Sequence, residues 1–167
     1  MTLTDAQLDR YARHIVLREI GGAGQMRLLN ADVVVIGAGG IGSPAILYLA
    51  AAGVGKIRVI DDDVVALSNL QRQIAHGTPD IGRAKVDSAK DRAAALNPEV
   101  KLVPYQMRLN PDNVMELLAD YDIIVSGADN FPARYLINDA APTIDTSTSV
   151  PPSGVVVGRE PPPEIVE

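Results

Sequence analysis

One stretch of the sequence constrains the fold more than any other, because it joins a β-branched run, a glycine-rich turn and a helix. The run is DVVVI over residues 32–36, and the turn GAGGIG follows over residues 37–42. A continuous β-branched run is typical of a strand buried on both faces of a parallel sheet. In a G-x-G-x-x-G turn the glycines permit a tight bend, a close approach of phosphate and close helix–strand packing. The stretch therefore predicts a nucleotide-binding turn made by Gly37, Gly39, Gly40 and Gly42.

Strands and helices alternate along the rest of the chain, which predicts an α/β fold with a mostly parallel, Rossmann-like sheet flanked by helices. Further strands are expected over residues 56–60, 102–107 and 122–126, with helices over 42–52, 84–96, 112–119 and 133–141. A capping box of Thr4 and Gln7 predicts a short N-terminal helix. Glycines at 21, 22 and 24 are expected to break the helical pattern before a brief helix over 25–30.

The composition changes after residue 141, where six prolines and six serines or threonines occur within 26 residues. This favours a domain over residues 1–141, including the N-terminal helical segment, and an extended or disordered tail over residues 142–167. We expect no strand in the tail.

Charge and cysteine content narrow the functional class. The formal net charge is −6 and the pI is near 4.9, which argues against a general nucleic-acid binder. No apolar run is long enough to span a bilayer and no secretory signal is evident, so we expect a cytoplasmic protein with no membrane partner. The chain contains no cysteine, so we expect no thiolate zinc site.

Charged and polar residues follow the strands at their carboxyl ends, where ligands bind in open parallel sheets. Asp61 lies 19 residues beyond Gly42, near the spacing expected of a carboxylate that holds a ribose hydroxyl. Cations that could stabilise phosphoryl oxygens and acids that could hold Mg²⁺ complete the set. We expect the following residues to converge on one pocket: Asp61, Asp63, Asn69, Arg72, Lys85 and Asp129. Such a set suits a triphosphate better than a nicotinamide, although NAD-dependent oxidoreductases use the same glycine turn.

Six motifs together resemble a known family. In order they are RYAR at 10–13, GAGGIG at 37–42, DDD at 61–63, SNLQRQ at 68–73, GRAK at 82–85 and DN at 129–130. Their order and spacing resemble the ubiquitin-activating-type adenylyltransferases, the sulfur-carrier adenylyltransferases of molybdopterin and thiamin biosynthesis. The match covers about residues 8–141 and is far more specific than the glycine turn alone.

The resemblance implies ATP-dependent adenylation of the C-terminal glycine of a ubiquitin-like sulfur-carrier protein. It places Gly40 against the phosphates and Asp61 on the ribose, and gives Mg²⁺ to Asp129. Arg13 would enter the site of a partner subunit, so a homodimer is implied. The triphosphate contacts that the resemblance implies come from Asn69, Arg72, Gln73 and Lys85, with Arg72 and Lys85 stabilising charge as the α-phosphate is attacked.

The sequence departs from the family pattern after residue 141. Further strands and paired zinc-binding cysteines that many relatives carry have no counterpart here, so we expect a C-terminally truncated form that lacks the second half of the family sheet. Two alternatives stay open: a non-catalytic nucleotide-binding partner or remnant of such an enzyme, and a NAD-dependent oxidoreductase.

Overall fold

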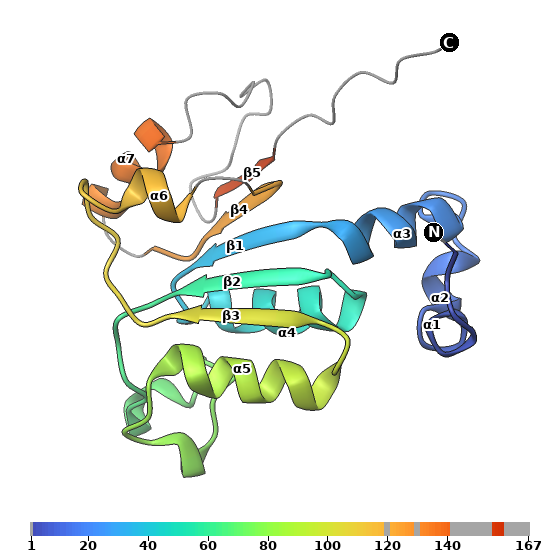
Figure 1. Ribbon diagram of the computed structural model, residues 1–167. Helices are drawn as coiled ribbons and strands as arrows, with labels where there is room; N and C mark the ends of the chain where they lie inside the picture. Colours follow the sequence, from blue (N-terminus) through green and yellow to red (C-terminus); the bar gives the residue numbers. More distant parts are fainter. Residues whose placement is uncertain (1, 119–120, 129–130, 141–154, 159–167) are drawn as a thin grey trace.

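A five-stranded sheet with helices on both faces forms the body of the protein (Figure 1). The computed structural model describes residues 2–118, 121–128, 131–140 and 155–158. The strand order is β3-β2-β1-β4-β5, and β1 to β4 are parallel, which confirms the predicted Rossmann-like sheet. The strands are β1 (Asp32–Ile36), β2 (Lys56–Ile60), β3 (Lys101–Tyr105), β4 (Ile123–Ser126) and β5 (Val155–Gly158).

Helices connect these strands and close both faces of the sheet. Helices α4 and α5 pack together beneath β1, β2 and β3, while α6 and α7 contribute to the core on the opposite face (Figure 1). Among the described helices, none is long and apolar enough to cross a membrane. The helices are α1 (Asp5–Arg10), α2 (Ala12–Ile15), α3 (Gly21–Asn30), α4 (Gly42–Ala52), α5 (Lys85–Leu96), α6 (Val114–Leu117) and α7 (Phe131–Ala140), with single 3₁₀ turns η1 (Leu67–Asn69) and η2 (Thr78–Asp80).

Strand β1 is the centre of the sheet and is buried on both faces, as its β-branched run predicts. Val33 and Val35 belong to the core cluster that contains Ile46 of α4. Val34 belongs to the opposite cluster, which contains Ile137 of α7. Because side chains alternate along a strand, this one short run contributes side chains to the cores on both faces of the sheet.

Two predictions need correction, one about the glycines of the N-terminal segment and one about the end of a strand. Helix α3 runs through the glycines that were expected to break it. The buried Gln25 donates a hydrogen bond to the Ala52 carbonyl (2.9 Å), and the Gly55 N–H donates to the Leu28 carbonyl (3.0 Å). This docking offsets the low helix propensity of glycine. Strand β3 ends at Tyr105 and not at residue 107, because its partner β2 ends opposite it, at Ile60.

The fifth strand is the element that the sequence did not predict. Val155–Gly158 pairs antiparallel with β4, with Val155 opposite Ser126. Its short β-branched run stands among prolines, which obscured it as a strand. The proposed domain boundary at residue 141 stays a prediction, and the rest of the predicted tail lies outside the described residues.

A buried polar cluster attaches the N-terminal helices to the sheet domain. The side-chain amide of Asn97, 0% exposed, donates to the Tyr11 hydroxyl (2.9 Å) and to the Ala50 carbonyl (2.8 Å). Gly53 has φ +82°, and a Cβ there would lie 2.5 Å from the Tyr11 ring. The glycine therefore makes room for the tyrosine, and Asn97 satisfies the hydroxyl that the ring brings into the interior.

We predict that Asn97→Ala lowers the free energy of unfolding by about 2–3 kcal/mol, because it leaves a cavity and removes the donor to the buried Tyr11 hydroxyl, whereas the Ala50 carbonyl keeps the Gly53 N–H (3.1 Å). Asn138→Ala, the same change at an exposed position of α7, should alter it by less than about 0.5 kcal/mol. Urea denaturation followed by circular dichroism measures both. Equal losses in the two variants would contradict the structural role given to Asn97.

Candidate nucleotide-binding site

The glycine turn joins the end of β1 to the start of α4 with very little space between backbones. Gly37 has φ +87° and donates its N–H to the Ile60 carbonyl (2.8 Å). A Cβ on Gly42 would lie 1.7 Å from the Gly37 carbonyl oxygen. A Cβ on Gly127, just after β4, would lie 3.2 Å from that same oxygen. The turn is therefore closed by glycine packing, as its pattern predicts.

The backbone of Ala38 is held at both its N–H and its carbonyl group. Its N–H donates to Asp61 Oδ2 (2.7 Å), and its carbonyl accepts a hydrogen bond from His76 Nε2 (3.0 Å). Among the described residues no acceptor is bonded to the N–H groups of the next three residues of the turn, which precede the first turn of α4. Three donors at a helix N-terminus suit an anion. These donors belong to Gly39, Gly40 and Ile41.

A cavity of about 1010 Å³ lies beside this turn. It opens at the carboxyl ends of β1, β2 and β4, where the chain order reverses on either side of β1, the usual place for ligands in such sheets. Most of the predicted site residues line this one cavity. They are Gly37, Gly39, Gly40, Asp61, Asp63, Asn69, Arg72, Gln73 and Lys85.

Two cations of the cavity are held in different ways. Lys85, 5% exposed, donates from Nζ to Asp63 Oδ2 (2.7 Å), and its backbone N–H donates to the Asp63 carbonyl (3.0 Å). Arg72 is exposed, packs beside Gly40 and donates from Nη1 to the Ser68 carbonyl (3.2 Å). Within the described part of the chain, Arg72 makes no ion pair with a carboxylate. Its guanidinium therefore keeps donors for an anion in the cavity.

Gln73, one of the predicted triphosphate contacts, is the buried member of the lining with an unsatisfied side-chain acceptor among the described residues. Its side chain is 3% exposed, and its Oε1 has no hydrogen-bond partner among the described residues. A buried acceptor without a donor is costly, so this atom fits a ligand or water that brings an N–H or O–H group. Asn69 is already engaged, since its Oδ1 accepts from the Ala66 N–H (3.1 Å).

Three consecutive carboxylates could hold a cation at the end of β2. Asp61, Asp62 and Asp63 have ligand atoms within 4.8 Å of one another. Oxygen ligands of this kind fit Mg²⁺. Asp61 is already bound to the N–H groups of Ala38 and Asp63, and Asp63 to Lys85, so Asp62 is the least engaged of the three. Asp129, the residue predicted to bind Mg²⁺, lies outside the described residues.

Two predicted site residues do not line the cavity. Gly42 closes the turn from beneath, as its contact with Gly37 shows. Arg13 is exposed on α2, at the end of the sheet opposite the cavity, beside the residues that attach the N-terminal helices (Figure 1). Arg13 is therefore remote from the candidates that line the cavity.

The structure adds residues that sequence reasoning missed. Residues 107–111, which follow β3, line the cavity with Met107 and Leu109 among them. Tyr135 of α7 lines it as well and is 67% exposed, and Arg134 Nε donates to the Ala128 carbonyl (3.0 Å). Their position after the carboxyl end of a parallel strand was the signal that could have identified the first group.

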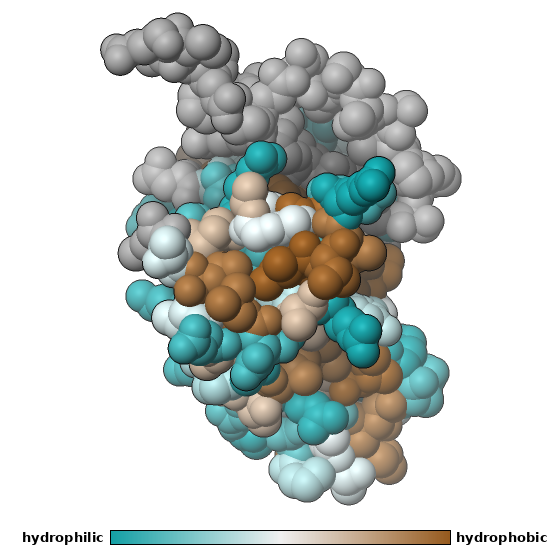
Figure 2. All heavy atoms as spheres, turned by 90° about the vertical axis from the view of Figure 1, so that its right-hand side faces the viewer, coloured by the Kyte–Doolittle hydropathy of each residue, from teal (hydrophilic) through white to brown (hydrophobic). Residues whose placement is uncertain are grey.

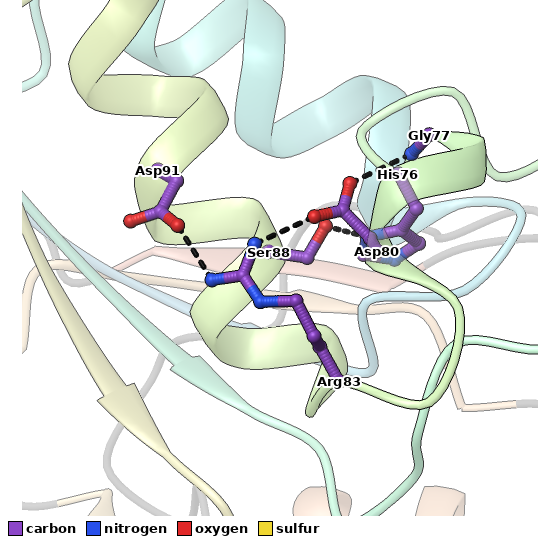
Figure 3. A network of polar contacts seen from close by, with 6 residues as sticks. All are labelled: His76, Gly77, Asp80, Arg83, Ser88 and Asp91. Atoms are coloured by element: carbon purple, nitrogen blue, oxygen red, sulfur yellow. Dashed lines mark hydrogen bonds and ion pairs between the residues drawn. The ribbon is translucent and has the colours of Figure 1, made fainter.

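A second polar network lies behind the glycine turn (Figure 3). Burial raises the pKa of Asp80, but hydrogen bonds from the Gly77 N–H, Ser88 and Arg83 outweigh burial and hold that pKa below 3.8. Arg83 also pairs with Asp91 (2.6 Å), and its two carboxylate partners raise the pKa of its guanidinium. The loop between η2 and α5 is thus fixed by charge pairs at its surface.

We predict that Gly42→Ala lowers the free energy of unfolding by about 2–3 kcal/mol, since backbone atoms must move to admit the new Cβ. Gly40→Ala is the matched control, because the nearest atom to its Cβ is Arg72 Cδ at 3.6 Å, an ordinary contact. That variant should stay within about 1 kcal/mol of the unmodified protein in urea denaturation. The reverse order of the two losses would contradict the packing described.

The depressed pKa of Asp80 predicts a pH dependence. A carboxylate whose folded-state pKa is lowered contributes stability above its unfolded-state pKa and loses it as the pH falls through the folded-state value. The difference in unfolding free energy between the protein and Asp80→Asn should therefore be complete above about pH 4 and shrink below pH 3.8. Urea titrations from pH 6 to pH 3 measure it. A difference that does not change with pH would contradict this role.

The fold and the cavity together define a Rossmann-like domain with an anion-receptive glycine turn. The ThiF family matches residues 11–155, and the chain belongs to this family. It is 52% identical over 139 residues to the "Probable adenylyltransferase/sulfurtransferase MoeZ" of Mycobacterium tuberculosis, covering 83% of this chain and 36% of that protein. It is 49% identical over 141 residues to the "Sulfur carrier protein adenylyltransferase" of Thermus thermophilus, covering 84% and 52% respectively. The chain thus spans between about a third and half of the length of these relatives.

A solved structure has a similar fold. The tRNA N6-threonylcarbamoyladenosine dehydratase TcdA of E. coli, in complex with ATP, superposes with a TM-score of 0.77 at 28% identity. The similarity covers 82% of this chain and 56% of that one.

Proposed function

We propose that this chain binds ATP and adenylates the C-terminal glycine of a ubiquitin-like sulfur-carrier protein. The observation that carries the proposal is the cavity that combines Arg72 and Lys85 with three backbone donors of the glycine turn, which are bonded to no acceptor among the described residues. Backbone donors and two cations in one cavity match the charge of a triphosphate. The names of the relatives, an adenylyltransferase/sulfurtransferase and a sulfur carrier protein adenylyltransferase, support the same chemistry.

The reaction needs charge stabilisation more than proton transfer. The carboxylate of the carrier is ionised at neutral pH, so one of its oxygens attacks the α-phosphorus without a general base. The bond from the α-phosphorus to the bridging oxygen breaks, and pyrophosphate leaves with the electron pair. Arg72 and Lys85 lie where they would stabilise the oxygens of the phosphates in this step.

The cavity has residues that could contact the ribose, the base and the phosphates of the nucleotide. Asp61 lies at the end of β2, where a ribose hydroxyl would meet its carboxylate. The apolar residues Met107 and Leu109 line the same cavity and offer contact area for a base. Mg²⁺ would neutralise phosphate charge, held by Asp129 together with carboxylates such as Asp62.

The proposal includes a homodimer, because Arg13 does not line the cavity that the described residues of its own chain form. The face of the molecule that carries α1 to α3 bears a gathering of apolar surface (Figure 2). Leu8, Val16 and Leu17 of this segment are 43%, 74% and 47% exposed. Apolar surface of this kind is suited to association. A second subunit would both cover it and receive Arg13.

ATP–pyrophosphate exchange in the presence of a panel of molybdopterin-type and thiamin-type carriers tests the proposal. We predict exchange that requires one carrier and falls by a factor of about 10²–10³ in Lys85→Ala, which removes the buried cation. Lys90→Ala, an exposed lysine of the same helix, should retain it. ATP binding without exchange under any carrier would identify a non-catalytic nucleotide-binding partner instead, and equal exchange in the two variants would overturn the role of Lys85.

A further inference from the structure

His76 lies directly behind the glycine turn and contacts it through one atom. The side chain is 7% exposed, and Nε2 is 3.0 Å from the Ala38 carbonyl oxygen. Nδ1 is 2.9 Å from Ser88 Oγ on α5. Because a carbonyl oxygen only accepts hydrogen bonds, Nε2 must carry a hydrogen and donate it to Ala38.

The other side of the imidazole is fixed by a chain of contacts that ends at the protein surface. Figure 3 shows His76 against Ser88, with the Asp80 carboxylate beside them. Asp80 hydrogen-bonds with Ser88, accepts from the Gly77 N–H (2.8 Å) and pairs with Arg83 (2.6 Å). The Ser88 hydroxyl has one hydrogen to give, to Nδ1 or to Asp80, and in both arrangements Nε2 remains the donor to the turn.

The hydrogen bond to Ala38 sets the direction of the next donor. A trans peptide is planar, so the Ala38 carbonyl and the Gly39 N–H point in opposite directions. No described peptide is cis. Holding the carbonyl toward His76 therefore turns the Gly39 N–H to the other side of the peptide, and Gly39 lines the cavity. Glycine rotates more freely than other residues, so without this restraint the peptide could turn its carbonyl oxygen toward a bound phosphate.

We propose that His76 is a positioning residue for the phosphate-binding turn: through Ala38 it keeps the Gly39 N–H directed into the cavity. This inference rests on the proposed function, since it requires that the cavity receive a phosphate-bearing ligand. His76 acts through Ala38 and is not among the residues that line the cavity.

The test compares ATP with adenosine, which lacks the phosphates. We predict that His76→Leu weakens ATP binding about tenfold, because the hydrogen bond that orients the Gly39 N–H is lost. Adenosine binding should be unchanged. His76→Gln, whose amide can still donate to Ala38, should bind ATP within about threefold of the unmodified protein. Titration of isotope-labelled protein followed by NMR gives both affinities, and melting curves show that each variant is folded.

His14→Leu is the matched control, because the only other histidine bonds Gln25 at a distance from the cavity. It should leave the ratio of the two affinities unchanged. If His76→Leu does not fold, Ser88→Ala tests the proposal in its place, because it removes the hydrogen-bond partner of His76 Nδ1. This variant should bind ATP about threefold more weakly and bind adenosine with unchanged affinity. Equal weakening of ATP and adenosine, or no change in either variant, would overturn the positioning role. An unmodified protein that binds no ATP would overturn the proposed function itself.

Discussion

The candidate site depends on the close approach of three backbone segments at the end of β1. Gly37, Gly42 and Gly127 meet at the Gly37 carbonyl oxygen, where the Cβ of any other residue at 42 would lie 1.7 Å away. This contact brings the start of α4 close to the end of β4. As a result, the backbone N–H groups that precede α4 belong to residues that line the cavity. Valines buried on both faces of β1 hold that point in place. Close packing in the core thus holds the small polar turn in one conformation, as recognition of an anion by backbone donors would require.

Charge in the cavity is balanced within the protein before any ligand arrives. Lys85 is buried and would be costly without a partner, and Asp63, which is 67% exposed on its side chain, provides one. Arg72 is bonded only to a backbone carbonyl among the described residues. A triphosphate would therefore meet one cation that is free to turn toward it and one that must share its carboxylate partner. The neighbouring acids at the end of β2 keep the region from being purely cationic, which suits a ligand that arrives with Mg²⁺.

The elements that could be predicted from the sequence are those whose signals are local. The β-branched run, the glycine turn and the capping box of Thr4 each specify their structure within a few residues, and each is present. The features that were missed depend on contacts between distant segments. His76 is 38 residues from Ala38, helix α3 forms through glycines because it docks at Ala52, and β5 forms because β4 offers an open edge. The helix and strand propensities of the residues in these segments do not predict such contacts.

The backbone donors and cations of this cavity favour ATP over a dinucleotide. Isothermal titration calorimetry of the purified chain with ATP and with NAD, each with Mg²⁺ present, distinguishes the two ligands. The expected result is saturable binding of one ATP per chain, which a large excess of NAD does not displace. Binding of NAD in preference to ATP, or binding of neither, would contradict it.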